Sequence, residues 1–453
     1  MNELSTATPE AMEVEMAIEE VESPSVPTPT LDSLPEDILC CILSWIEPSP
    51  DVRWVWHHGM SRICSSIRAV ANRYFLPTIL NLDILWPGMA GEDRIPYKHR
   101  LAFLRSFLTL QSRSQAVHEL RLKKWPRWRD ADEIVRAMLT SPNLLVNLKR
   151  VSIIKEDAVF VVPPDFLIDM SRAHPGLSHL CIHDSFRSCL AMSRDQVLRF
   201  SRTMSSLRVL RLKDAYFLDD IHMAILSSAC TNLEELELSN HRTPMSSITD
   251  QGLQILAKHC TKLTVLKLCL VQITWAGLES LLAANPGLVS LNISCCCNIG
   301  ALACDSIARL ALNLQVLHCH GCHWLDDHGL DRLVSSSSSL RTIGLDNTHV
   351  TPEGVYHMLQ KRPQYLGKAP KNSLLAAIDI GYFHSTLEKR LRSMHVHSFD
   401  EVQSVKDIWL LLATEFDVNF AVTRNHDFGG TCSCRSAAKC RQFFNTGMMR
   451  VLN

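Results

Sequence analysis

The hydrophobic positions of the chain repeat one short pattern ten times. From residue 117 onward, the order apolar-x-x-apolar-x-apolar recurs at intervals of 25 to 35 residues. Alternating apolar positions of this kind are typical of a short strand with one buried face. We therefore predict ten strands, in phrases that begin at Val117, Leu148, Leu177, Leu207, Leu233, Leu263, Leu288, Leu314, Leu340 and Leu375.

The segments between these phrases have the spacing of helices. Leu253, Leu256 and Ala257, for example, are apolar at positions i, i+3 and i+4. A single strand-helix unit cannot bury its apolar face alone, so such units stack on one another. The predicted fold class is therefore α/β. We expect a curved solenoid over residues 81–385, with parallel strands on its concave side and helices on its convex side.

Two recurring features give these units a family resemblance. Cys230 and Cys260 each stand three residues before a phrase. Segments 248–253, 325–330 and 350–355 share the order apolar-x-x-x-Gly-apolar. Together these features resemble the cysteine-containing subclass of leucine-rich repeats, most closely over residues 207–360. That subclass occurs mostly in F-box proteins.

A separate helical module is predicted over residues 31–80. Leu34-Pro35 opens an apolar stripe that indicates a helix over residues 34–46. This segment resembles the first helix of an F-box. Residues 61–70 resemble a later helix of that family, with Ile67 where the family usually has Trp. The resemblance implies that the module docks on a Skp adaptor, and through it on a cullin, by Leu34, Pro35, Ile38, Leu39, Ile42, Leu43 and Ile46. Alternatively, the helix merely covers the end of the solenoid.

Charge is distributed unevenly along the chain. Residues 1–52 hold twelve Asp and Glu and no Lys or Arg, so the other residues carry 46 basic and 35 acidic side chains, a net charge of +11. Residues 1–30 are rich in Glu, Pro, Ser and Thr and contain no aromatic residue, which predicts a disordered acidic tail. We expect residues 386–453, which lie outside the repeats, to cap the solenoid.

Three features bear on the compartment. No apolar run approaches the roughly 18 residues that a membrane span needs. The N-terminus lacks the basic and apolar regions of a signal peptide. The 17 cysteines are odd in number and include sequence neighbours such as Cys40 and Cys41, which indicates reduced thiols. We therefore expect a cytoplasmic or nuclear protein that does not bind a membrane.

Side chains that alternate with the buried positions of each phrase should face the concave surface. The basic residues and histidines predicted there are Arg121, Lys123, Arg150, Arg211, Lys213, Lys267, His318 and His320. A groove with a basic first half would attract an acidic or phosphorylated segment of a target protein. Two alternatives stay open. The charges form only a solvated face, or the acidic tail folds back onto the groove.

Three further groups suggest chemistry, and each has a simpler explanation. Residues 319–323 (Cys-His-Gly-Cys-His) have a haem-like or zinc-like spacing, but the phase of the repeat puts both cysteines in the core. The cysteines of segment 426–440 lack a standard zinc spacing, and the basic-aromatic run 123–129 lacks an RNA-binding motif. We therefore predict no metal, no cofactor, no nucleic acid and no catalytic residue.

The order of these segments implies a function by resemblance. An F-box followed by such repeats implies the substrate-recognition subunit of an SCF-type (Skp–cullin–F-box) E3 ubiquitin ligase, which is a non-catalytic subunit. The alternative is a leucine-rich-repeat scaffold or inhibitor that binds a protein partner outside any ubiquitin ligase. A third hypothesis is a metalloenzyme built on the cysteine-histidine clusters, which zinc analysis would test.

Overall fold

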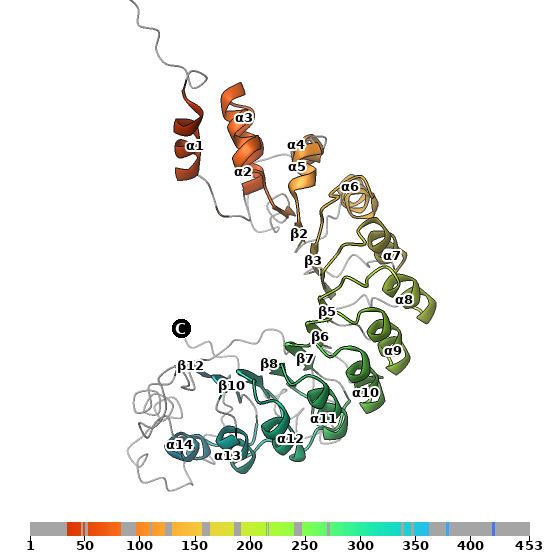
Figure 1. Ribbon diagram of the computed structural model, residues 1–453, viewed down its shortest axis with the longest axis vertical. Helices are drawn as coiled ribbons and strands as arrows, with labels where there is room; N and C mark the ends of the chain where they lie inside the picture. Colours follow the sequence, from red (N-terminus) through yellow and green to blue (C-terminus); the bar gives the residue numbers. More distant parts are fainter. Residues whose placement is uncertain are drawn as a thin grey trace, which may run out of the picture.

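The structure is a curved array of strand-helix units preceded by three helices (Figure 1). It is a computed structural model. It describes residues 34–46, 49, 53–82, 97–108, 111–122, 129–155, 164–184, 192–213, 215, 217–239, 247–269, 272–336, 339–345, 348–361, 377–379 and 419–421.

Twelve strands form one parallel sheet in sequence order. The strands are β1 (Ile79–Asn81), β2 (Glu119–Leu122), β3 (Arg150–Lys155), β4 (His179–Asp184), β5 (Val209–Lys213), β6 (Glu235–Ser239), β7 (Val265–Cys269), β8 (Ser290–Asn292), β9 (Val316–His318), β10 (Thr342–Gly344), β11 (Ala377–Asp379) and β12 (Asn419–Ala421). The register keeps equivalent residues side by side, with Leu210 opposite Leu236 and Leu236 opposite Leu266. Equivalent side chains therefore form continuous columns across the sheet.

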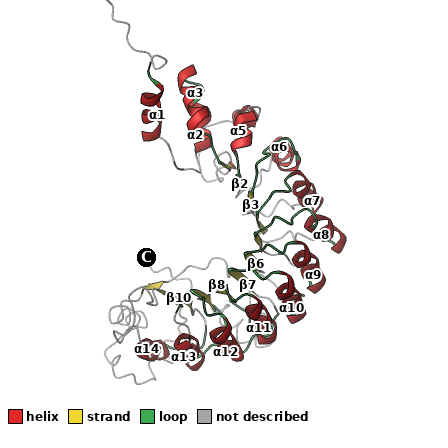
Figure 2. Ribbon diagram, in the orientation of Figure 1, coloured by secondary structure: helices red, strands yellow, loops and turns green. Residues whose placement is uncertain are grey.

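Helices follow the strands and cover the outer side of the arc (Figures 1 and 2). Those of the solenoid are α4 (Tyr97–Leu108), α5 (Gln111–Ala116), α6 (Arg129–Thr140), α7 (Pro164–Ala173), α8 (Arg194–Ser201), α9 (Asp220–Ala229), α10 (Asp250–His259), α11 (Trp275–Ala284), α12 (Leu302–Leu310), α13 (Asp327–Ser336) and α14 (Pro352–Lys361). The three helices that precede the sheet are α1 (Glu36–Trp45), α2 (Arg53–Met60) and α3 (Ser65–Tyr74). The strands line the inner side of the arc, so the concave surface is formed by the sheet.

The core lies between the sheet and the helices and is built from the repeated leucines. In the unit that contains β6, Leu233, Leu236 and Leu238 are all buried. Burying one such side chain contributes roughly 1.5–3 kcal/mol, and the same positions are buried in the neighbouring units. Cys230 and Cys260 are fully buried, and burial raises the pKa of each thiol to about 12. They are therefore neutral core residues.

A hydrogen-bonded latch joins the starts of successive helices. The carboxylate of Asp220, in the first turn of α9, accepts hydrogen bonds from the backbone N–H and the hydroxyl of Thr249, at 2.8 and 2.7 Å. Thr249 is the N-cap of α10, so the latch fixes one helix to the next. The same arrangement joins Asp250 with Thr274, and Asp327 with Thr351.

The structure confirms the predicted curved leucine-rich-repeat fold. Each of the ten phrases contains one of the strands β2 to β11. Strands β1 and β12 were not predicted, because Pro77 and Asp417 stand where their phrases would begin with an apolar residue. The tail 1–30 lies outside the described residues, as does most of segment 386–453. The domain boundaries therefore stay predictions.

Candidate protein-binding surfaces

The three N-terminal helices form a small module with its own core. Leu39 and Leu43 of α1 are buried and pack with Ile67, Val70 and Phe75 of α3 and its C-terminal end. Ile67 stands where the resemblance would place Trp, and here it is a buried member of the module core. The inner face of α1 is therefore occupied within the chain.

Polar contacts and α2 fix the module in place. Arg73 Nη1 of α3 lies 2.7 Å from Glu36 Oε1 of α1. The Nε2–H of His57 in α2 donates a hydrogen bond to the carbonyl of Ala71 in α3, at 3.1 Å. Val55 of α2 packs against the main solenoid core, and α2 also contacts β1. The module is thus attached to the solenoid through α2, and α1 lies on its far side (Figure 1).

The outer face of α1 is apolar and exposed. Ile38 and Ile42 are 45 and 42 % exposed, and Ile46, just beyond the helix, is also exposed. Trp45 is 86 % exposed, although it was not among the residues predicted to dock. A tryptophan this open to water at the end of an isoleucine stripe is unusual for a surface without a partner. We call these four residues the outer face of α1.

The predicted docking residues therefore divide into two groups. Leu39 and Leu43 are core residues of the module and are not accessible to a partner, so they do not belong among the docking residues as predicted. Leu34 is half-buried against the same core, and Pro35 is exposed at the N-cap of α1. Only the isoleucines and Pro35 remain open to a partner.

The basic residues of the concave face are engaged by glutamates. Arg121 Nε and Arg150 Nη1 lie 2.5 and 3.8 Å from the carboxylate of Glu119. Arg211 Nε lies 2.5 Å from Glu235 Oε1. The first half of the concave groove, which was expected to be basic, is therefore partly neutralised, because acidic side chains of the same sheet lie beside the arginines. Lys123 lies outside the described residues.

A second charged cluster surrounds one buried carboxylate. The Glu237 side chain is 8 % exposed, and its Oε1 lies 3.0 Å from Lys267 Nζ and 3.7 Å from Lys213 Nζ. Removing one partner of a buried ion pair typically costs about 3–5 kcal/mol, because the other charge stays buried. Lys213 and Lys267 therefore stabilise the sheet, in addition to any contact with a ligand.

The two concave histidines lie together. His318 Nδ1 and His320 Nε2 are 3.2 Å apart, and their ring centroids are 5.3 Å apart. Both rings lie over Gly344 of the neighbouring strand β10, where a Cβ would stand 2.6 Å from His318 Nδ1 and 2.5 Å from His320 Nε2. His320 is buried, so His318 is the more accessible member of the pair.

The cysteines of segment 319–323 belong to the core, as the phase of the repeat predicted. Cys319 and Cys322 are fully buried, and burial raises the pKa of the Cys322 thiol well above its ordinary value. No group of three or more His, Cys, Asp or Glu side chains within the described part of the chain is arranged to hold a metal ion. Segment 426–440 and residues 123–128 of the basic-aromatic run lie outside that part.

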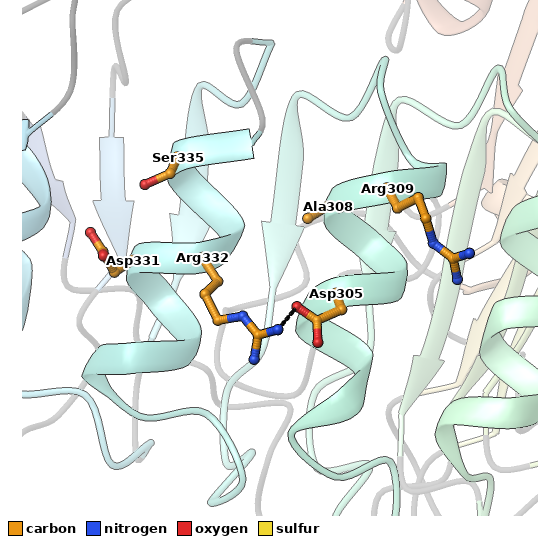
Figure 3. Close-up of a pocket in the computed structure, with 6 residues that line it drawn as sticks. All are labelled: Asp305, Ala308, Arg309, Asp331, Arg332 and Ser335. Carbon is orange, nitrogen blue, oxygen red and sulfur yellow. Dashed lines mark ion pairs between the residues drawn. The ribbon is translucent and has the colours of Figure 1, made fainter.

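A surface groove of about 480 Å³ lies between α12 and α13 (Figure 3). Asp305 and Arg309 line it from α12, and Asp331, Arg332 and Ser335 line it from α13. An ion pair between Arg332 and Asp305 crosses the groove (Figure 3). This pair joins the two helices, so we assign the charged side chains that line the groove a role in holding α12 against α13.

No described helix is long and apolar enough to cross a membrane.

Three solved structures show low similarity to this chain. No protein-family model matches the chain, and neither does any curated protein. A chain of the yeast Rad7–Elc1 complex covers 79 % of this chain and 85 % of its own length, with a TM-score of 0.44 and 14 % identity. The leucine-rich-repeat-containing protein LegL7 from Legionella pneumophila covers 73 % of this chain and 99 % of its own, with a TM-score of 0.39 and 12 % identity. An internalin from Listeria monocytogenes covers 53 % of this chain and 64 % of its own, with a TM-score of 0.32 and 17 % identity.

Proposed function

We propose that the chain is the substrate-recognition subunit of an SCF-type E3 ubiquitin ligase. In this proposal the module α1–α3 is an F-box that docks on a Skp adaptor, and through it on a cullin. The solenoid binds the target protein, and the chain itself performs no chemistry. Holding target and ligase together raises the effective concentration of target lysines near the ubiquitin-conjugating enzyme. The proposal implies a protein of the cytoplasm or nucleus.

The outer face of α1 is the observation that carries the proposal. The opposite face of α1 already packs on α3, so the exposed isoleucines and Trp45 are not needed for the fold of the module. Exposed apolar side chains on one face of a helix suit a partner with a hydrophobic groove. The location of α1, on the side of the module away from the solenoid, leaves that face accessible.

Two substitutions on this face test the proposal. In an Ile38→Asp, Ile42→Asp chain, docking would bury two carboxylates without partners, which should weaken binding to a purified Skp adaptor roughly a hundredfold or more. Neither residue belongs to the module core, so the variant should fold normally.

A matched control adds the same two charges elsewhere. Ile221 and Leu302 are exposed apolar residues of α9 and α12, and Ile221, at 46 %, is as exposed as Ile38. An Ile221→Asp, Leu302→Asp chain should co-purify with the adaptor as the wild type does. If the wild type does not bind the adaptor, the proposal is wrong, and the scaffold or inhibitor hypothesis takes its place.

A further inference from the structure

On the concave face over β3, β4 and β5, the positive side chains are more exposed than the negative side chains that pair with them. The Arg150 and Arg211 side chains are 56 and 43 % exposed, whereas their partners Glu119 and Glu235 are each 17 % exposed. The carboxylates therefore lie beneath the guanidinium groups. A ligand that approaches the sheet meets the positive groups first, although the total charge of the patch is small.

The two arginines flank the same strand. Arg150 of β3 pairs in register with His179 of β4, and Cys181 of β4 pairs with Arg211 of β5. Neighbouring strands lie about 4.8 Å apart, so β3 and β5 are roughly 10 Å apart with β4 between them. The two arginines stand two residues apart in register, and their guanidinium groups contact Glu119 of β2 and Glu235 of β6. This spacing leaves room for one anionic group over β4, which the two arginines would reach from the strands on either side.

The contacts of the arginines leave donors for a ligand. Arg211 is held through Nε alone, so the two terminal nitrogens of its fork are not engaged by Glu235. The ion pair of Arg150 with Glu119 is loose, at 3.8 Å. A guanidinium that is already oriented by a carboxylate loses less side-chain entropy when it binds an anion.

The side chains of β4 between the arginines carry no negative charge. Burial, followed by the nearby Arg150 and Arg208, lowers the pKa of His179 against the opposing effect of Glu235 and Glu119, so its imidazole is neutral at pH 7. Burial raises the pKa of Cys181, so its thiol stays neutral despite the opposing effect of Arg211. The two side chains at the centre of the patch therefore add no negative charge of their own.

We propose that Arg150 and Arg211, on either side of His179 and Cys181, form a binding site for the phosphate or carboxylate group of a peptide segment in the target protein. The inference rests on the proposed function for the existence of a target. It assigns the site to one place on the solenoid, whereas the sequence indicated only a broadly basic half.

Three degenerate peptide pools, identical except for a central serine, phosphoserine or aspartate, provide the test. Fluorescence polarisation with the full-length chain should show at least a tenfold preference for one of the anionic pools over the serine pool, and the preference should weaken at high salt. The pool that binds more tightly identifies phosphate or carboxylate as the natural group.

Substitutions assign the preference to the site. An Arg150→Gln, Arg211→Gln chain should lose the preference of roughly tenfold or more and bind the three pools alike. An Arg150→Lys, Arg211→Lys chain keeps both charges and should bind several-fold more weakly than wild type, because an ammonium group cannot form the bidentate contact. An Arg309→Gln, Arg332→Gln chain, which loses the same charge on the convex helices, should keep the full preference.

Equal binding of the three pools would overturn the inference, as would a preference that survives the glutamine substitutions at 150 and 211. Binding of a single-stranded oligonucleotide in place of any peptide pool would overturn it as well. Adaptor binding is measured on the same proteins. Loss of peptide preference with adaptor binding intact refutes this site alone, whereas absent adaptor binding with an intact preference refutes the ligase function alone.

Discussion

Gly252→Ala should destabilise the solenoid, although alanine usually stabilises a helix relative to glycine. A Cβ at position 252 would overlap Asp220 Oδ1 and stand 3.2 Å from Ile248 Cγ2. Asp220 would have to rotate away, which breaks its two hydrogen bonds from Thr249. The helix start would then lose its connection to the preceding unit.

The expected size follows from these contacts. The two hydrogen bonds are exposed, so their loss costs about 1 kcal/mol each. Residual crowding near Ile248 adds about 1 kcal/mol. The better helix propensity of alanine offsets about 1 kcal/mol of this. The net expectation is a loss of about 2 kcal/mol in the free energy of unfolding.

Urea unfolding followed by far-UV circular dichroism measures the change, and amide hydrogen exchange in α10 locates it. Gly287, in the turn after α11, is the matched control because a Cβ there meets no atom within 4 Å. Gly287→Ala should stabilise the chain by about 0.4–1 kcal/mol. In an Asp220→Ala background the overlap is gone, so Gly252→Ala should be neutral or stabilising. If Gly252→Ala lowered the free energy of unfolding equally in both backgrounds, or did not lower it in the wild type, the hydrogen bonds between Asp220 and Thr249 would not account for the effect.

Three further predictions concern other parts of the chain. Leu43→Ala should cost about 2–5 kcal/mol by opening a cavity in the module, and hydrogen exchange should increase in α3 while β6 stays protected. Burial alone would raise the pKa of Asp219, but hydrogen bonds from His222 and Arg194 lower it to about 2, from 3.8. Its stabilisation should therefore be complete above pH 3.8 and lost as the pH falls towards 2. Acid unfolding of an Asp219→Asn chain should lack that loss. Cys230, with its pKa near 12, should resist alkylation of the native protein at pH 8, whereas the exposed Cys41 should react, as mass spectrometry would show.

The repeats could be predicted because their signal is local. Each strand needs apolar residues at alternate positions of one phrase, and those residues stand together in the sequence. Where a phrase lacks its first apolar residue, as at Pro77 and Asp417, the strand forms because it pairs with a neighbour that is already in place. Such pairing is a long-range contact that periodicity does not report.

The candidate surfaces depend on contacts that periodicity could not supply. The α1 helix is apolar on most sides, so only its packing on α3 distinguishes the buried Leu39 and Leu43 from the exposed Ile38 and Ile42. Apart from the pair of Arg121 with Glu119, the concave ion pairs described above join residues of different units, such as Arg211 and Glu235. Which of two such side chains lies outermost is a matter of packing, and the charge of a ligand site depends on it.

The most direct test of the ligase function is a calorimetric titration of a purified Skp adaptor into the full-length chain at several temperatures. We expect saturable one-to-one binding with a negative heat-capacity change, because the outer face of α1 becomes buried. This binding should be abolished by Ile38→Asp, Ile42→Asp and unchanged by Ile221→Asp, Leu302→Asp. An adaptor that does not bind the wild-type chain, or that binds both variants equally, would contradict the ligase function.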